Sequence, residues 1–387
     1  VLQEAFRTTE TCRFADLLLP AASWGEKEGT VTNSERRISH VRQAIPAPGQ
    51  ARADWAITVD FAQRLEQRLR PGTPSLFAFD QPQALFDEYK QLTRERDLDL
   101  SGISYAVLDQ QGPQQWPFPA GARTGTPRLY GDGIFPTESG RANFIAEPYR
   151  AAKELRDARF PLTLNTGRLR DQWHGMSRTG TAARLFGHVS EAVLSLHPDE
   201  MRRHRLQAGD LVSLKSRRGS LIVPVSSDDS VRPGQAFLPM HWGDRFLKGG
   251  VNVLTQPAFD PLSKQPELKH TGVRIEAVTL PWQLFALVEG DVQAHLEALR
   301  PLCENFAYAS LSLAGRERPA LLIRAASTQA PDNQLLTQID QLLGLNEGPV
   351  LSYDDPRRSI GKRVRIENGR ITAIRLAGET IDRKSVV

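Results

Sequence analysis

The stretch P-L-T-L-N-T-G-R-L-R-D-Q-W-H-G-M-S-R-T-G, residues 161–180, decides the fold that we expect for the middle of this chain. It opens with a short apolar run that is typical of a strand. The remainder is crowded with glycine, threonine, arginine, tryptophan and histidine. The pattern predicts a strand that leads directly into a loop able to contact a ligand.

The loop carries the groups that a phosphorylated, aromatic ligand needs. Gly167 and the amides beside it can approach a phosphate closely, and Arg168 can bind a phosphate through two hydrogen bonds. Trp173 offers a stacking face, and His174 can donate a hydrogen bond or relay a proton. A rigid loop around a buried tryptophan and a satisfied histidine would have the same composition, so both interpretations stay open.

Further short strands follow this loop. They are predicted at 211–214, 221–225, 236–239 and 273–278. His197–Glu200 begins a short helix, because proline stands at its first position and acids fill its first turn. Residues 159–280 are therefore expected to form a compact, double-psi-like β-barrel with one or two helices.

Residues 1–70 have the pattern of one piece of an α/β domain. Ala15–Pro20 is a short apolar run ended by proline, which suits a buried parallel strand. Ala53–Leu69 has apolar residues at helical spacing, with Asp54 placed to start the helix. Since the chain lacks an initiator methionine and opens inside an apolar pattern at Val1, we expect the rest of this domain to lie upstream.

The other segments complete a fold class of α/β plus β. Residues 71–158 alternate short helical patterns with proline- and glycine-rich loops, and are expected to connect or cover rather than form a core. Residues 281–381 are expected to be a small α+β extension, with a helix candidate at 282–299 and a hairpin turn at Asn368-Gly369. One choice of codons for 382–387 resembles a common sequencing adapter, so we treat this tail as a candidate non-native segment.

A second polar loop follows the apolar run at 15–20. It reads W-G-E-K-E-G-T-V-T-N-S-E-R-R, residues 24–37, and places charges and glycines after a strand. In open α/β sheets ligands bind at the carboxyl ends of strands, so Lys27 could meet a phosphate or polarise a reacting oxygen. A solvated loop with exposed glutamate–lysine pairs is the alternative.

A third group of candidates lies near the end of the predicted barrel. It comprises P-M-H-W-G-D at 239–244, Asn252, and P-L-S-K-Q-P-E-L-K-H at 261–270. Asn252, Lys269 and His270 could hydrogen-bond a heterocycle or a phosphate. Taken singly, each of these side chains is more often structural.

Composition narrows the class of protein. The chain has 387 residues, of which 40% are hydrophobic and 24% charged, which excludes wholesale disorder, collagen-like repeats and a disulfide miniprotein. No apolar stretch is long enough to span a membrane, and no signal peptide is visible. The net charge is +4, but the basic residues are scattered, so a nucleic-acid partner is not expected.

Several common motifs are missing. GxxxxGK[ST] and GxGxxG do not occur, so neither a P-loop nor the common dinucleotide fingerprint is supported, and GxSxG and HExxH do not occur either. Cys12 and Cys303 have no partner at metal-ligand spacing. We therefore expect two reduced thiols, and neither a metal site nor an iron–sulfur cluster held by this chain alone.

Together, the three motifs resemble those of molybdopterin oxidoreductases that carry bis-molybdopterin guanine dinucleotide. E-K-E-G-T-x-x-N-S-E-R-R resembles a loop of their third domain, N-T-G-R-x-R-D-Q-W-H-x-M-S-R-T-G the start of their C-terminal dinucleotide-binding barrel, and D-P-L-S-K-Q-P-E-L-K-H its last cofactor contact. Within the family, R-D-Q-W-H, P-M-H-W-G, E-L-K-H and the module at 353–380 look most like the assimilatory nitrate reductase catalytic subunits.

The resemblance implies a cofactor and its contacts. The cofactor is Mo-bis(molybdopterin guanine dinucleotide), with a 4Fe-4S cluster in the full-length protein only. The family's molybdenum-ligating and cluster cysteines would lie upstream of Val1, so no catalytic or metal-binding residue is expected here. Residues that match cofactor contacts are Lys27, Asp54, Thr166, Gly167, Arg168, Leu169, Arg170, Asp171, Gln172, Trp173, His174, Gly175, His241 or Trp242, Asn252, and Lys269 or His270.

The implied function is the two-electron reduction of nitrate to nitrite by oxygen-atom transfer. We expect a cytoplasmic fragment of a nitrate-assimilation enzyme, inactive alone, that contributes cofactor binding. Its implied partners are nitrate and an electron donor such as ferredoxin, flavodoxin or an NADH-linked subunit, with no nucleic acid and no membrane. A related enzyme such as a formate dehydrogenase is one alternative, and a stand-alone module that binds a nucleotide-like ligand without catalysis is the other.

Overall fold

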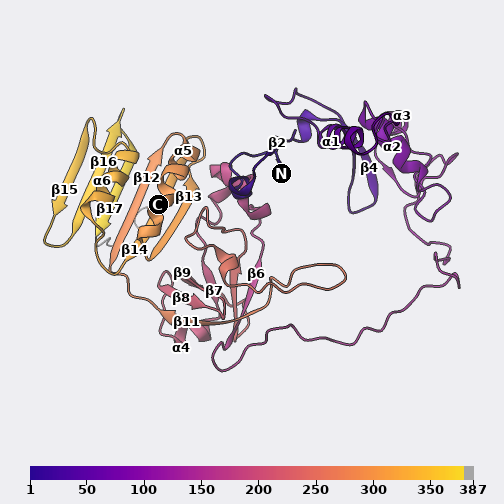
Figure 1. Ribbon diagram of the computed structural model, residues 1–387. Helices are drawn as coiled ribbons and strands as arrows, with labels where there is room; N and C mark the ends of the chain where they lie inside the picture. The colour runs from indigo at the N-terminus through magenta and orange to yellow at the C-terminus, as the bar shows by residue number, and fades with distance from the viewer. Residues whose placement is uncertain (379–387) are drawn as a thin grey trace. The chain divides into compact units, whose positions relative to one another are not determined.

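The computed structural model describes residues 1–378, which form two compact units, Val1–Pro148 and the part that begins at Tyr149. In Figure 1 the first unit runs from indigo to purple and the second from magenta to yellow. The candidate tail at 382–387 and the last three residues of the predicted extension lie outside the described residues. The boundaries that we predict inside each unit stay a prediction.

The first unit begins with a small parallel sheet. β1 (Leu2–Glu4) pairs in parallel with β2 (Leu18–Pro20), so the parallel strand predicted there is present. The prediction that it is buried is wrong: within the described chain this sheet has only two strands, and Leu18 is exposed on it. α1 (Asp54–Leu69) begins and ends as predicted.

A second sheet shares a core with two helices. β4 (Arg37–Val41) pairs antiparallel with β3 (Gly29–Thr32) and β5 (Gln114–Gln115). α2 (Pro82–Gln91) and α3 (Tyr105–Gln111) follow α1 along the chain. The buried cluster consists of Ile38, Phe86, Leu100, Ile103, Tyr105, Leu108 and Phe118. The helical segments after residue 71 therefore bury their apolar side chains together with β4.

The second unit begins with a closed β-barrel, which confirms the barrel predicted from the sequence. The order around the barrel is β10-β6-β11-β8-β9-β7. The strands are β6 (Leu162–Gly167), β7 (Leu194–Leu196), β8 (Leu211–Lys215), β9 (Ser220–Ser227), β10 (Gln235–Pro239) and β11 (Thr271–Ala277). α4 (Pro198–Arg203) begins at the predicted proline. The finer double-psi connection stays a prediction.

The barrel is filled by branched apolar side chains. One from each of five strands is fully buried: Leu164, Leu194, Leu214, Val223 and Leu238. Burying such a side chain stabilises a fold by about 1.5–3 kcal/mol. The parallel register of β6 and β10 sets Gly167 opposite Pro239, so the loops that follow these two strands leave the barrel at the same rim.

A six-stranded antiparallel sheet follows the barrel. Its order is β13-β14-β12-β17-β16-β15. The strands are β12 (Trp282–Glu289), β13 (Tyr308–Ala314), β14 (Ala320–Ser327), β15 (Val350–Asp355), β16 (Ile360–Glu367) and β17 (Arg370–Gly378). α5 (Val292–Leu299) and α6 (Asn333–Leu342) contact each other and lie on one face of the sheet (Figure 1).

The helix predicted at 282–299 is wrong in its first half. β12 occupies 282–289, and its side chains alternate between buried and half-buried, which is the period of a strand. Gly290 then adopts a φ of +126°, and Asp291 caps α5 through its side chain. Only the second half of the predicted segment is therefore helical.

One apolar core runs through the barrel and the six-stranded sheet. The 3₁₀ turn Ala183–Phe186 packs against β13, and Leu247 forms an antiparallel bridge with Ser310 of that strand. At the centre, the ring of Trp242 lies 6.0 Å from that of Phe186 and 6.3 Å from that of Phe246. The loop after β10 thus contributes to the apolar wall between the barrel and the six-stranded sheet.

Candidate functional site

The predicted contacts of the first unit meet at the start of α1. Lys27 follows the turn Trp24–Glu26, and its ammonium group donates a hydrogen bond to Asp54, the first residue of α1. Gln3 Nε2 donates to the other carboxylate oxygen at 2.6 Å. Burial raises the pKa of Asp54, but the hydrogen bonds from Lys27 and Gln3 outweigh it and lower the pKa below its ordinary value. Asp54 is therefore a carboxylate at neutral pH.

This ion pair lies on the wall of a cavity of about 390 Å³. Lys27 Nζ lies 5.4 Å from the centre of the Trp24 ring. The aromatic residues that line the cavity are Trp24, Trp55, Phe86 and Tyr89. Aromatic walls with one ion pair suit a planar heterocycle that carries polar groups.

A charged network that we did not predict supports this cavity. His40 on β4 is hydrogen-bonded to Glu28 at 3.1 Å and to Asp109 of α3 at 2.7 Å. Arg42 donates to the same Asp109 carboxylate. The His40 ring also lies 4.1 Å from the ring of Tyr105. No sequence pattern links Glu28 with Asp109, because only the packing of α3 on β4 brings them together.

In the second unit the predicted contacts gather at the barrel rim where β6 and β10 end. Thr166 Oγ1 donates to the carbonyl oxygen of Leu268 at 2.8 Å, and Met240 N donates to that of Gly167 at 2.9 Å. Three segments that are far apart in the sequence therefore meet here. Packing disfavours any larger residue at Gly167, since a Cβ at this position would lie 2.6 Å from the Phe237 ring.

His241 is the most unusual side chain at this rim. It is only 3% exposed, and neither ring nitrogen has a hydrogen-bond partner among residues 1–378. Burial lowers the pKa of His241, and the positive charges of Arg168 and His174 lower it further. Its neighbour Trp242 is fully buried in the apolar core, although its indole N–H also lacks a partner within the described chain.

The loop at 168–180 is anchored by the buried Gln172 and contains residues with strained backbone conformations. Gln172 is buried and donates from Nε2 to the carbonyl oxygen of Leu185 at 3.1 Å, whereas its Oε1 accepts no hydrogen bond from the described residues. His174 and Met176 adopt φ values of +46° and +60°. A left-handed conformation costs such residues about 1–2 kcal/mol, and strain of this kind often marks functional sites.

The other residues of this loop are more accessible. Trp173 is half-exposed, and its ring meets His174 edge-on at 4.2 Å, so the alternative with a buried tryptophan is wrong. Arg170 forms an ion pair with Asp171 at 2.9 Å. Arg168, His174 and Gly175 are exposed, and Leu169 is half-buried.

The later candidates differ in burial. Asn252 is exposed in the 3₁₀ turn Val251–Val253, and Lys269 is exposed as well. His270 is half-buried, and its Nε2 atom is buried without a partner in the part of the chain that the structure describes. His270 therefore resembles His241 in having an unpaired ring nitrogen.

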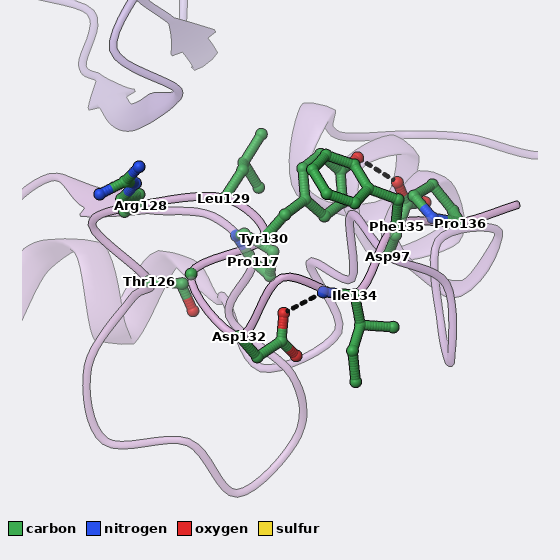
Figure 2. A pocket seen from close by; sticks show the side chains of 11 residues that line it. Asp97, Pro117, Thr126, Arg128, Leu129, Tyr130, Asp132, Ile134, Phe135 and Pro136 are labelled. Atoms are coloured by element: carbon green, nitrogen blue, oxygen red, sulfur yellow. Dashed lines mark hydrogen bonds between the residues drawn. The ribbon is translucent and has the colours of Figure 1, made fainter. Parts of the chain in front are cut away.

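A further cavity, of about 480 Å³, lies among the loops between residues 97 and 136 and was not predicted (Figure 2). Tyr130 donates to Asp97 at 2.8 Å, and its ring packs on that of Phe135 at 4.9 Å. The Asp132 carboxylate accepts from the backbone N–H of Ile134 at 3.0 Å. Contacts within these loops thus hold the shape of the cavity wall.

Residues 1–378 contain no group of three or more histidine, cysteine, aspartate or glutamate side chains that could hold a metal ion. None of the helices in this range has the length and apolar character needed to cross a membrane.

Comparison with protein families matches both units. The molydopterin dinucleotide binding domain matches residues 162–272, which contain the first five barrel strands and the start of β11. Molybdopterin oxidoreductase matches residues 1–64, which contain Lys27 and Asp54. The chain belongs to the molybdopterin oxidoreductase family. The resemblance seen in the sequence motifs is thereby confirmed.

Curated relatives in this family include nitrate reductases and formate dehydrogenases. A nitrate reductase of Klebsiella oxytoca is 36% identical over 82% of this chain and 36% of its own length. An assimilatory nitrate reductase catalytic subunit of Bacillus subtilis is 33% identical over 69% of this chain and 36% of its own length. An F420-dependent formate dehydrogenase subunit alpha of Methanocaldococcus jannaschii is 34% identical over 72% of this chain and 39% of its own length. The matched part of the chain thus spans less than two fifths of each relative.

Among solved structures, acetylene hydratase from Pelobacter acetylenicus aligns with this chain over 70% of this chain and 39% of the hydratase chain. The sequence identity is 17% and the TM-score 0.47.

Proposed function

We propose that this chain forms part of the cofactor-binding shell of a molybdenum oxidoreductase, with the barrel rim holding the molybdopterin dinucleotide. The observation that carries the proposal is His241, which is buried with both ring nitrogens unpaired within the described chain and within electrostatic range of Arg168 and His174. An unpaired buried polar group costs about 1–3 kcal/mol, so the rim fits a polar ligand that supplies partners. The arginine and histidine side chains at the rim can also bind the phosphates of the proposed cofactor.

The residues proposed to hold the cofactor are those matched by motif. They are Lys27 and Asp54 on the first unit, and Thr166 to Gly175, His241, Asn252 and His270 on the second. Where the motifs left a pair open, burial favours His241 over Trp242, which packs in the core, and His270 over the exposed Lys269. When bound, the cofactor supplies the molybdenum for two-electron oxygen-atom transfer, and these side chains bind and orient it.

The proposed reaction is the reduction of nitrate to nitrite in cytoplasmic nitrate assimilation. Relatives that are named nitrate reductases support this choice. An electron-donor protein or domain and an iron–sulfur cluster held elsewhere would complete the enzyme. Oxidation of formate is the second candidate, because a formate dehydrogenase subunit matches this chain at 34% identity.

The test uses the complete gene product that contains this chain. With reduced viologen as electron donor, we expect the wild type to reduce nitrate, and the isolated 387-residue chain to show no turnover. Arg168→Ala should lower the molybdenum content per chain several-fold, because it removes a two-hydrogen-bond phosphate contact worth about 1.5–3 kcal/mol. Arg202→Ala is the matched control, since Arg202 pairs with Asp199 on α4.

The outcomes separate the candidates. Formate oxidation without nitrate reduction would replace the proposed substrate and leave the cofactor assignment intact. Equal molybdenum content in wild type, Arg168→Ala and Arg202→Ala would count against the barrel rim as the cofactor site. Turnover by the isolated chain would contradict the proposal that it contributes only part of the enzyme.

A further inference from the structure

The loop that carries His241 is held at its two ends by the barrel. At the start, Met240 N donates to the carbonyl oxygen of Gly167 at 2.9 Å. At the end, Arg218 Nη2 donates to the carbonyl oxygen of Leu254 at 3.2 Å. The barrel therefore fixes where the loop leaves and returns, and the residues between these points need other support.

The middle of the loop pairs with the edge of the six-stranded sheet. Leu311 N of β13 donates to the carbonyl oxygen of Phe246 at 2.7 Å, and Lys248 N donates to that of Ala309 at 3.0 Å. Lys248 Nζ donates to the carbonyl oxygen of Phe306 at 2.7 Å. Loop residues 246–248 thus act as a short additional strand on β13.

Arg300 joins the same sheet module to the turn that follows His241. Its Nη2 atom lies 2.6 Å from Asp244 Oδ2, and its Nε atom donates to the carbonyl oxygen of Asp244. Nη1 donates to Glu304 at 2.8 Å. Burial lowers the pKa of Arg300, but hydrogen bonds with Glu304 and Asp244 outweigh it and raise the pKa above its ordinary value. The guanidinium group is therefore charged and fully engaged.

We propose that Arg300 is a positioning residue that holds the turn at Asp244 so that the His241 ring faces the ligand of the barrel rim. The proposal rests on the cofactor-binding function proposed above and adds a role for the sheet module. The turn is tight enough to transmit the hold, since Gly243 N donates to the carbonyl oxygen of His241 at 3.0 Å. Val251 N donates to that of Trp242 at 2.9 Å, which closes the loop behind the ring.

The chemistry of the contact calls for arginine. One planar guanidinium reaches a backbone carbonyl and two carboxylates at once, whereas a lysine ammonium is a point charge on a flexible stem. Asp244 and Glu304 are 52% and 56% exposed, so removing Arg300 leaves both carboxylates in water. Arg300→Met keeps an unbranched apolar stem without the guanidinium group and is expected to fold.

Hydrogen–deuterium exchange of the full 387-residue chain tests the hold on the loop. In Arg300→Met, amides within 240–254 should exchange about tenfold faster than in wild type, and in Arg300→Lys at an intermediate rate. Arg370→Met is the matched control, because Arg370 pairs with Glu289 at 2.6 Å across β17 and β12 of the same sheet. Unchanged exchange in Arg300→Met, or an equal rise in Arg370→Met, would overturn the proposal.

Molybdenum content of the complete gene product connects the loop to its ligand. Arg300→Met should retain several-fold less molybdenum than Arg370→Met, and Arg300→Lys should recover part of it. Faster exchange with an unchanged molybdenum content would overturn the positioning role. A wild type that holds no molybdenum would instead contradict the proposed function, and the exchange comparison would still decide whether Arg300 holds the loop.

Discussion

The imidazole of His241 owes its properties to burial and to two positive neighbours. Because the pKa of His241 in the folded chain lies below its ordinary value of 6.5, the folded state keeps this ring neutral where the unfolded chain already binds a proton. The contribution to stability is therefore complete above the unfolded pKa and is lost as the pH falls below it.

His241→Asn should consequently flatten the pH dependence of stability. As the pH falls below about 6.5, the wild type should lose up to about 1.4 kcal/mol of unfolding free energy per pH unit through this group, and the variant should not. Urea unfolding at several pH values measures the slope. His188→Asn, at a more exposed histidine, is the control, and an identical slope in wild type and His241→Asn would show that the ring titrates normally.

At the scale of single residues, the sequence motifs predicted segments that meet at the barrel rim, but not which side chain of the pair 241–242 packs in the apolar core. His241 and Trp242 are adjacent and both suit a ligand, and only the packing of Trp242 between Phe186 and Phe246 separates their roles. Arg300 was not predicted at all. Its partner Asp244 lies 56 residues away in the sequence, and no local pattern encodes that contact.

At the scale of elements, local chemistry predicted turns better than it predicted helix against strand. Asn368 and Gly369 adopt φ values of +51° and +76°, as the two-residue hairpin turn requires. By contrast, the apolar residues of 282–289 fit either period over so short a run. The sheet decided the outcome, because β12 pairs with both β14 and β17 and lies between them.

Gly369→Ala tests the hairpin turn between β16 and β17. Alanine at a φ of +76° should lower the unfolding free energy of the second unit by about 1–2 kcal/mol, even though its Cβ would meet nothing within 4 Å. Gly187→Ala is the control, since Gly187 has a helical φ of −67°. Denaturant unfolding compares the two, and equal stability of both variants would mean that the turn tolerates a side chain.

At the scale of the whole molecule, the two compact units have separate buried cores. The stretch of chain around their boundary contains exposed aromatic residues, with Phe144 97% and Tyr149 90% exposed. No helix or strand is found from 116 to 161 in the described chain. A chain segment of this kind is the preferred site of proteolytic cleavage.

Brief chymotrypsin treatment of the 387-residue chain should therefore cut after Phe144 or Tyr149 and release the two units as separate fragments. Mass spectrometry identifies the cut. Replacing both residues by serine should slow the appearance of these fragments at least about tenfold. Early cleavage after the buried Phe186 or Phe246 instead would show that the second unit opens more readily than the linker.

The apolar wall between the barrel and the six-stranded sheet has a practical consequence for anyone who wishes to excise the cofactor module. A polypeptide that stops near residue 280 would keep every barrel strand but would strip the cover from Phe246 and Leu247. Such a truncated protein would aggregate through the newly exposed apolar surface. The smallest soluble fragment that contains the barrel must therefore include the six-stranded sheet as well.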